Sequence, residues 1–514
     1  MDRKPCSFAD MAPTVDDGTR PVNSPPAPGP VPAIAAGQAL ADRDGVLRDL
    51  SRYLAQAWAS FDCPRPSEPT VDPVLVERLQ AALPEDGDDP QDALGDAVGI
   101  LDASISPARP LYLAYVGSTG LETGVLASAL SAAYDANLAS AAGAADLLDQ
   151  QAVRGVADFV GFPLGEGHFT SGGQLSNLTA LLAAREQALP GAREHGVDGR
   201  RGTVYCSDEA HHSVVRAVEA AGLGRRALRR LPTDQRRRMR VDALVDAVAR
   251  DRADGFTPVA VVATAGTTLT GAVDPLDDIA DVCGRENVWM HVDGAYGAPA
   301  AASATAGHWF TGLDRADSVT VDAHKWLGMQ KSCSVVLLRR RGPLRAAFGH
   351  EERYMLHDED AANPVDSTFE YSRPFRSLRL WLSLRVYGAR QFRTWIDGTL
   401  QNAALLTEAV RARPSFELLH EPMLSTVCFR HVPADLAEDQ LNHHNERLAR
   451  AMQHDGRVFL APATLDGNTC LRTCFVNFRT TPDAVPHVLD VAEELGRDLL
   501  ASERSAPAHD GRTP

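Results

Sequence analysis

The feature that most constrains the fold is a regular alternation of short apolar segments and helical segments between about residues 120 and 340. The apolar segments have the length of buried strands and cover residues 202–207, 258–266, 288–296, 318–324 and 333–340. The segments with helical periodicity lie between them, at 213–222, 241–251 and 276–285. Because strands that alternate with helices form a mostly parallel sheet covered by helices, we predict an α/β fold. Ligands on such sheets bind beyond the carboxyl ends of the strands, so the residues that follow each strand are candidates for a site.

The rest of the chain divides around this region. We predict a Pro-rich disordered tail at 1–36 and an N-terminal helical segment at 37–120. A large domain follows at 121–390, a smaller α+β domain at 391–501, and a second disordered tail at 502–514. The Arg-rich run at 225–240 is interpreted as a solvated face. No internal repeat is visible.

Composition excludes several classes of function. The 514 residues carry a net charge of −17, which argues against nucleic acid or an anionic membrane as the main partner. The sequence contains no run of 18 apolar residues, so we predict no membrane span. The eight cysteines are scattered without a CxxC pair, which favours a reducing, cytoplasmic location and neither a metal site nor a disulfide framework.

Lysine is unusually scarce. The chain has three lysines, at positions 4, 325 and 331, against 48 arginines. Arginine cannot be deprotonated to a nucleophilic amine, whereas the pKa of lysine changes readily on burial. A lysine in the interior of this chain is therefore a candidate for covalent chemistry.

Four chemically distinctive groups follow the predicted strands. Asp293 follows the apolar residues 288–292, Lys325 follows the segment 318–324, and His211 follows 202–207. A fourth strand is followed by Gly172–Gly173 and a helix, and the exposed amides at such a helix start can bind an anion. A buried lysine, a carboxylate that keeps a pyridine nitrogen protonated, a histidine that stacks on a ring and a phosphate-binding turn together suit pyridoxal 5'-phosphate.

The motifs SDEAH, ATAGTT, HVDGAYG and VDAHKWLG, in this order and spacing, resemble those of the group II pyridoxal-phosphate-dependent amino-acid decarboxylases. The similarity runs from about residue 109 to about residue 500. It implies fold type I of the cofactor's transferase-like enzymes and a homodimer with active sites at the interface. It also implies decarboxylation of an L-amino acid to the amine and CO2.

The resemblance also implies roles for individual residues. Lys325 resembles the lysine that binds the cofactor covalently, Asp293 the partner of the ring nitrogen, and His211 the histidine stacked on the ring. The other cofactor-binding positions that match are Gly172, Gly173, Gln174, Thr268, Ala295 and His324, with Asp274 either near the cofactor or structural. Of these, Gln174 also fits an ordinary strand-to-helix turn.

Tyr354 lies 29 positions after Lys325, in HEERYMLHDED. This offset matches the tyrosine on the mobile loop of the family's decarboxylases, which donates a proton to the substrate α-carbon. Related aldehyde synthases carry Phe at that place. We therefore predict Lys325, His211, Tyr354 and Asp293 as catalytic residues.

The substrate is poorly specified by the sequence. Tyr115 and Ser118 in RPLYLAYVGSTG are predicted to bind the substrate. Tyr112 and Tyr115 each suit a pocket wall or core packing equally well. The small residues at 116–118 depart from the pattern of aromatic-amino-acid decarboxylases. Arg373 and Arg376 either meet a substrate or cofactor anion or form structural ion pairs.

Rival functions remain open at this point. An oxidative decarboxylase, an aldehyde synthase or a carbon–carbon lyase would share the fold, and a pseudo-decarboxylase would lack activity. The intact set of catalytic residue types argues against the last of these. A nucleotide-binding Rossmann protein is disfavoured because no GxGxxG opens a helix after the first strand.

Overall fold

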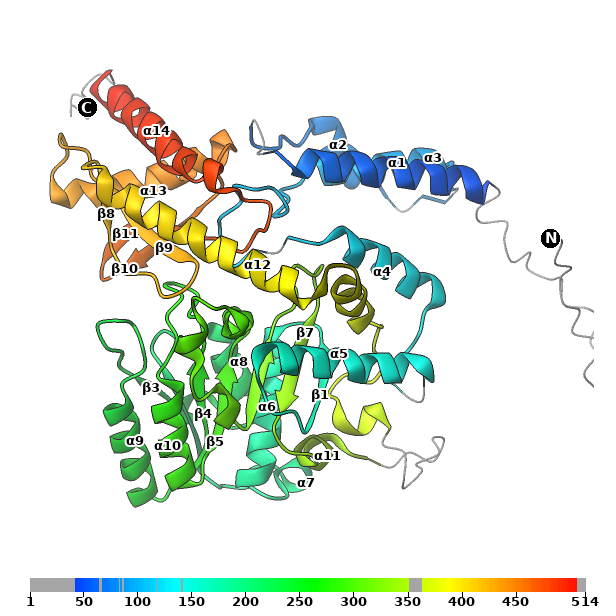
Figure 1. Ribbon diagram of the computed structural model, residues 1–514, viewed down its shortest axis with the longest axis vertical. Coiled ribbons are helices and arrows are strands. Elements are labelled where there is room, and N and C mark those ends of the chain that lie inside the picture. Colours follow the sequence, from blue (N-terminus) through cyan, green and yellow to red (C-terminus); the bar gives the residue numbers. More distant parts are fainter. Residues whose placement is uncertain are drawn as a thin grey trace, which may run out of the picture.

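The computed structural model describes residues 42–63, 67–82, 84–85, 87–117, 119–139, 142–350 and 363–505. The described chain contains a large α/β layer, a smaller α+β layer and a group of N-terminal helices, and one long helix connects the two layers (Figure 1).

A seven-stranded sheet forms the centre of the large layer, in the order β1-β7-β6-β5-β4-β2-β3. Its strands are β1 (Glu166–Thr170), β2 (Gly202–Ser207), β3 (Leu228–Leu231), β4 (Thr257–Thr264), β5 (Trp289–Asp293), β6 (Ser318–Val321) and β7 (Ser334–Leu338). The five strands from β6 to β3 are parallel, whereas β7 runs antiparallel to both β6 and β1. The α/β class predicted from the sequence is therefore confirmed.

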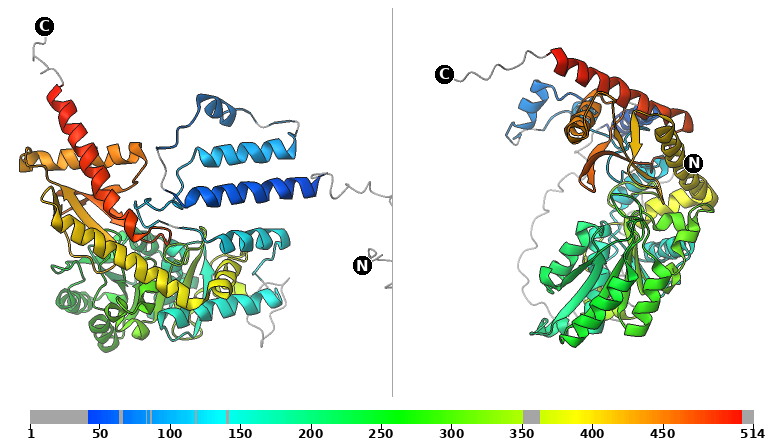
Figure 2. Two further views of the ribbon diagram at one scale, coloured as in Figure 1. Left: turned by 45° about the horizontal axis from the view of Figure 1, so that its top comes forward. Right: turned by 90° about the vertical axis from the view of Figure 1, so that its left-hand side faces the viewer.

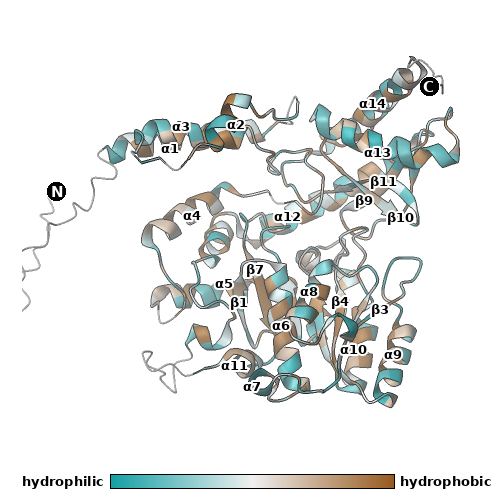
Figure 3. Cartoon of the chain, turned by 180° about the vertical axis from the view of Figure 1, so that it is seen from behind, coloured by the Kyte–Doolittle hydropathy of each residue, from teal (hydrophilic) through white to brown (hydrophobic). Residues whose placement is uncertain are grey.

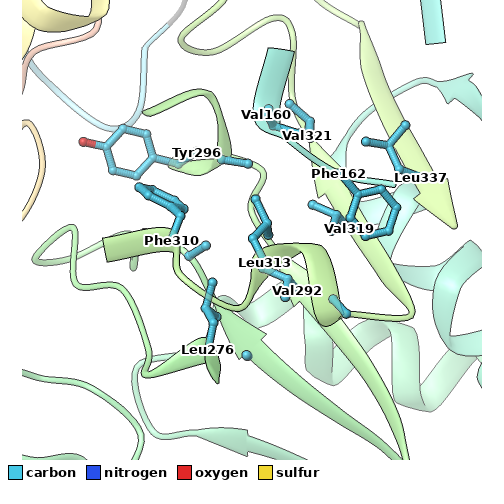
Figure 4. Packing of buried hydrophobic residues seen from close by; sticks show 14 of the residues in the cluster. Val160, Phe162, Leu276, Val292, Tyr296, Phe310, Leu313, Val319, Val321 and Leu337 are labelled. Atoms are coloured by element: carbon cyan, nitrogen blue, oxygen red, sulfur yellow. The ribbon is translucent and has the colours of Figure 1, made fainter. Parts of the chain in front are cut away.

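Helices cover both faces of this sheet. The helices of the large layer are α4 (Glu122–Tyr134), α5 (Ala144–Val160), α6 (Gly173–Ala188), α7 (Ala192–His195), α8 (His212–Ala220), α9 (Val241–Ala253), α10 (Leu276–Glu286) and α11 (Pro343–Phe348). Alternate residues of one strand enter two separate cores: Val261 packs in the cluster with α5, α9 and α10, and Val262 in the cluster with α6, α8 and α11. Figure 4 shows the first cluster, where Val292, Val319 and Leu337 of the sheet meet Leu276 and Phe162. Burial on both faces explains why the strands read as continuous apolar runs.

The smaller layer has a four-stranded antiparallel sheet in the order β10-β11-β9-β8. Its elements are β8 (Phe416–Leu418), β9 (Thr426–His431), α13 (Glu438–Asp455), β10 (Ala461–Leu465), β11 (Asn468–Cys474) and α14 (Pro486–Ser505). The connecting helix α12 (Ser377–Ala412) spans both layers and leaves helical geometry at Gly388, where φ is 74°. The predicted boundary at 390 lies beside this break.

The N-terminal helices are α1 (Arg43–Phe61), α2 (Pro73–Leu79) and α3 (Pro90–Asp102), and they project away from the body (Figures 1 and 2). Apolar side chains on them remain uncovered, with Leu47 58% and Leu101 69% exposed. Figure 3 shows both apolar and polar residues along these helices, whereas the strands of the large sheet are mainly apolar. No described helix meets the length and hydropathy needed to cross a membrane.

The Arg-rich run at 225–240 carries exposed arginines, among them Arg225, Arg226 and Arg230, as expected of a solvated face. The start of the Arg-rich run is not only a solvated face, because Leu228–Leu231 form β3, a parallel edge strand beside β2. Arg229 in this strand pairs with the buried carboxylate of Asp251 at 2.9 Å. The long-range partner, which no local pattern reveals, turns this arginine-rich segment into part of the sheet.

Candidate active site

The carboxyl ends of four parallel strands meet around one cavity of about 460 Å³. Its lining comes from segments far apart in the chain: Gly173, Gln174, Asn177, His211, Ser213, Thr264, Gly266, Thr268, Asp293, Ala295, Tyr296, Asp322 and Lys325. Seven of the residues predicted from the sequence are in this set: Gly173, Gln174, His211, Thr268, Asp293, Ala295 and Lys325. The parallel order β6-β5-β4-β2 brings them together, because neighbouring parallel strands end at the same edge of a sheet.

Lys325 follows β6, and its Nζ atom lies 3.3 Å from Oδ2 of Asp322. The same carboxylate oxygen lies 3.6 Å from Nε2 of His324. The other oxygen of Asp322 is buried and makes no hydrogen bond within the described ranges. The Asp322 carboxylate therefore lies beside both Lys325 and His324 and retains one oxygen that accepts no hydrogen bond from the described residues.

Asp293 ends β5 and is held by a chain of buried hydrogen bonds. Nδ2 of Asn177 donates to Oδ2 of Asp293 at 2.9 Å, and the Ala295 amide donates to Oδ1 at 3.2 Å. Oδ1 of Asn177 accepts from Nε2 of His291 at 3.0 Å, and Nδ1 of His291 contacts Oγ of Ser318 at 2.8 Å. Burial lowers the pKa of His291 to about 4, so this ring is neutral at pH 7. The carboxylate is thus fixed by neutral donors before any ligand binds.

His211 caps the start of α8, where its Nδ1 atom accepts a hydrogen bond from the Ser213 amide at 3.1 Å. Burial lowers the pKa of His211 more than the nearby charge of Asp293 raises it, and the charge of Lys325 lowers it further. A neutral ring with Nδ1 as acceptor carries its proton on Nε2. This side chain can therefore donate a hydrogen bond into the cavity.

The turn before α6 is built for close approach of a ligand. A Cβ atom added at Gly173 would lie 3.0 Å from Oδ2 of Asp322 and 3.1 Å from Cβ of Ala295, so a side chain here would crowd both neighbours. Gly172 and His324 flank the turn, because a Cβ atom on Gly172 would lie 3.9 Å from Cε1 of His324. The first turn of the 16-residue helix α6 supplies backbone amides and the positive end of its dipole.

Thr268 lines the cavity on a loop that is anchored by the smaller layer. Arg472 of β11, which is 4% exposed, donates to the backbone oxygens of Thr268, Leu269 and Tyr115. Tyr115 has a left-handed backbone with φ 57°. The guanidinium therefore connects two loops of the large layer through their main chains.

Of the two predicted substrate-binding residues, the structure describes Tyr115, which lies outside the cavity. The side chain of Tyr115 is 62% exposed and does not line the cavity. Tyr112 stacks on Phe459 with ring centroids 5.0 Å apart, which is packing between the two layers. Ser118 and Tyr354 lie outside the described residues.

The residues for which the sequence left two interpretations open have structural partners. Arg376 forms a two-pronged ion pair with Glu370 at 2.8 and 2.9 Å. Arg373 is 4% exposed and donates to the backbone oxygens of Leu138 and Phe169. Asp274 accepts from the amides of Met239 and Thr264, and burial raises its pKa to about 6.

Sequence reasoning missed Asn177 and Asp322. The spacing contained a signal for each: Asp322 precedes Lys325 by three positions in VDAHK, and Asn177 lies one turn into the helix that follows Gly172–Gly173. Neither residue type is distinctive enough without knowledge of its partner. Their positions became informative only when β5 and β6 were placed beside α6.

Pyridoxal phosphate fits the residues present. The cavity contains an amine on Lys325, a buried carboxylate on Asp293, and a helix start at Gly173 that admits an anion because it carries no side chain. Oγ1 of Thr264 lines the same cavity, is buried and makes no hydrogen bond to the described residues. The amine suits the aldehyde of the cofactor, the carboxylate suits its ring nitrogen, and the helix start suits its phosphate.

Comparisons with known proteins agree with this fit. Residues 73–432 match the model of the pyridoxal-dependent decarboxylase conserved domain. An aromatic-L-amino-acid decarboxylase of Bacillus atrophaeus is 33% identical over 448 residues, which cover 85% of this chain and 92% of that protein. The human cysteine sulfinic acid decarboxylase is 32% identical, with 69% and 75% covered, and an L-2,4-diaminobutyrate decarboxylase of Rhizobium meliloti is 37% identical, with 65% and 66% covered.

Solved structures are also similar. The crystal structure of mouse CSAD matches with a TM-score of 0.82 and 26% identity, covering 88% of this chain and 99% of that one. The structure of Catharanthus roseus tryptophan decarboxylase in complex with L-tryptophan matches with a TM-score of 0.81 and 25% identity, covering 91% and 100%.

Proposed function

Because the chain belongs to the pyridoxal-dependent decarboxylase family and is a pyridoxal-phosphate-dependent carboxy-lyase of an amino acid, we propose that the cavity around Lys325 is its active site. The observation that carries this proposal is that Lys325, Asp293 and His211, from three separate strand ends, line one cavity together with the Gly173 turn. The product is the amine that corresponds to an L-amino acid.

When bound, the cofactor withdraws electrons from the carbon that loses CO2. Lys325 would hold the cofactor covalently, and Asp322, 3.3 Å from its Nζ atom, keeps the amine in place. Asp293 would keep the ring nitrogen protonated, and the Asn177 amide orients its carboxylate. Gly172, Gly173, Gln174, Thr268 and His324 would contact the phosphate or the ring edge, with Ala295 packed against the ring.

His211 would contact the ring and present its Nε2–H to the substrate, since Nδ1 is already occupied by the Ser213 amide. Tyr354, predicted from the sequence, would deliver the proton to the α-carbon. A general acid of this kind contributes about 10²–10⁴-fold to the rate. Tyr115 and Ser118 would contribute to the substrate-binding segment.

We propose that the protein is a cytoplasmic homodimer with active sites at the interface. The uncovered apolar side chains on α1–α3 support association, because isolated helices with exposed leucines are stabilised by burial against a partner. Scattered thiols without disulfides, six of them buried in the described ranges, support a reducing compartment. Light scattering of the purified protein tests the dimer.

The function is tested by supplying the purified protein with pyridoxal phosphate and screening aromatic, acidic, basic and small aliphatic amino acids for CO2 release. We expect a visible absorbance band that Lys325→Ala abolishes, and borohydride reduction that fixes the cofactor at position 325. Product analysis with and without oxygen separates amine formation from an aldehyde synthase. A colourless protein that resists borohydride would overturn the proposal.

A further inference from the structure

Asp322 is a buried carboxylate that faces the start of α6. The residue lines the cavity and is 2% exposed. A Cβ atom added at Gly173 would lie 3.0 Å from Oδ2 and 3.1 Å from Oδ1 of Asp322, so both carboxylate oxygens lie beside the first residue of the helix. The first amides of a helix have no partner within it, which makes this helix start the place for the phosphate of the cofactor. The carboxylate and the phosphate would therefore be close neighbours in the cavity.

One oxygen of this carboxylate lacks a partner. Oδ2 lies 3.3 Å from Nζ of Lys325, whereas Oδ1 is buried and accepts no hydrogen bond from the described residues. The backbone of Asp322 is held on both sides, because its amide donates to the Ala295 oxygen at 3.1 Å and its oxygen accepts from the Lys325 amide at 3.1 Å. A buried oxygen without a hydrogen bond is unfavourable, and a ligand that supplies the missing partner removes that cost.

The positive charge near Asp322 does not suffice for two anions. The titratable groups that face it are Lys325 and His324 beside it, Lys331 farther along the same loop, His211 at the start of α8 and Asp293 at the end of β5. Burial lowers the pKa of both histidines, so their rings are neutral at pH 7. The side chain of Lys331 is exposed to solvent, and the proposed covalent bond to the cofactor uses the amine of Lys325. Two acidic groups that share a poorly solvated site cannot both remain ionised, so one of them keeps a proton.

We propose that Asp322 binds the phosphate of the cofactor through a shared proton. Oδ1 holds the proton as a carboxylic acid and donates a hydrogen bond to a phosphate oxygen, while Oδ2 stays beside Lys325. The proton comes from solvent, and no covalent bond changes in this contact. At pH 8, where a free phosphate monoester is ionised twice, binding of the phosphate group therefore takes up about one proton per site. The inference rests on the proposed function, because it needs the cofactor in this cavity.

The experiment counts the protons taken up when the apoprotein binds pyridoxal phosphate and, separately, pyridoxal, which lacks the phosphate. Calorimetric titration at pH 8 in two buffers with different heats of ionisation gives this number for each ligand. Both ligands carry the same aldehyde, so subtraction cancels the protons exchanged at Lys325. We expect the wild type to take up about one proton more with pyridoxal phosphate. Asp322→Asn, whose amide donates a hydrogen bond without an added proton, should abolish this difference.

Asp149→Asn is the matched control. Asp149 in α5 is also buried, at 7% exposed, and its Oδ1 atom likewise has no hydrogen-bond partner in the described ranges. It does not line the cavity. This variant should keep the wild-type difference of about one proton, which separates the effect of the site from that of removing any buried carboxylate.

Infrared difference spectra of the wild type provide a measurement that needs no variant. With isotope-labelled aspartate, loading with pyridoxal phosphate should produce the carbonyl band of a protonated carboxyl group, and loading with pyridoxal should not. Absence of this band in the wild type, or a proton difference that Asp322→Asn leaves unchanged, overturns the shared proton. The visible absorbance of the bound cofactor and CO2 release would then still support the proposed function. A wild type that shows neither of these overturns both.

Discussion

Replacing Asn177 with leucine tests whether the carboxylate of Asp293 is oriented before the cofactor arrives. The Asn177 side chain makes three buried hydrogen bonds, to Asp293 at 2.9 Å, to Ser213 at 3.0 Å and to His291 at 3.0 Å. Leucine has a similar volume and no polar atom. The substitution therefore removes the bonds and leaves three buried polar groups without that partner.

The expected magnitude follows from these contacts. A hydrogen bond to a charged acceptor contributes about 2 kcal/mol and a neutral one about 1 kcal/mol, so Asn177→Leu should lower the free energy of unfolding by about 4 kcal/mol. The bond to Asp293 is the one that affects the cofactor. Losing its contribution of about 2 kcal/mol weakens pyridoxal phosphate binding about 30-fold.

The assay is titration of the apoprotein with pyridoxal phosphate, followed by urea unfolding. Asn445→Leu is the control, because Asn445 is also fully buried and makes three hydrogen bonds, with the backbones of His431 and Leu441 in the smaller layer. We expect the control to lose about 3 kcal/mol of stability and no cofactor affinity. If Asn177→Leu binds the cofactor as tightly as Asn445→Leu, the orientation of Asp293 by Asn177 is refuted.

Three further outcomes are expected. Burial lowers the pKa of His431 to about 4. As pH falls from about 6.5 to 4, the unfolded chain binds a proton at this histidine before the folded chain does. The free energy of unfolding therefore decreases in that window, by about 2 kcal/mol at pH 5. Urea unfolding of His431→Leu should show a flatter pH slope in that window, and an equal slope contradicts the assignment. Arg472→Met should reduce kcat/KM about tenfold or more, mainly by raising KM, because it releases the loops of Thr268 and Tyr115. Arg472→Lys should restore part of the lost kcat/KM. A variant that loses thermal stability while keeping its kcat/KM would show a purely structural role. Tyr354→Phe should lose most amine product and, with dioxygen present, release aldehyde and ammonia, whereas undiminished amine output rules out its role as proton donor.

The sequence determined the fold class and much of the site because both are recorded in local patterns. A strand that is buried on both faces must be a continuous apolar run, and parallel strands end at one edge, so the residues after each run were expected to meet. Asp293, His211 and Lys325 each follow such a run, and all three line the cavity. The scarcity of lysine added chemical information that position alone does not give.

Only the tertiary structure decided which side chains support those residues. Asn177 bonds to a carboxylate 116 positions away, and Arg472 reaches Tyr115 across 357 positions. Such contacts have no period in the sequence, since they depend on how helices pack on a sheet and how two layers meet. The same holds for Arg373 and Arg376, which make hydrogen bonds and ion pairs with residues distant or unpredictable from the local sequence. It also holds for Leu228–Leu231, which form a strand by pairing with the edge of β2. Residue type and local spacing therefore specified the chemistry, and long-range packing specified its support.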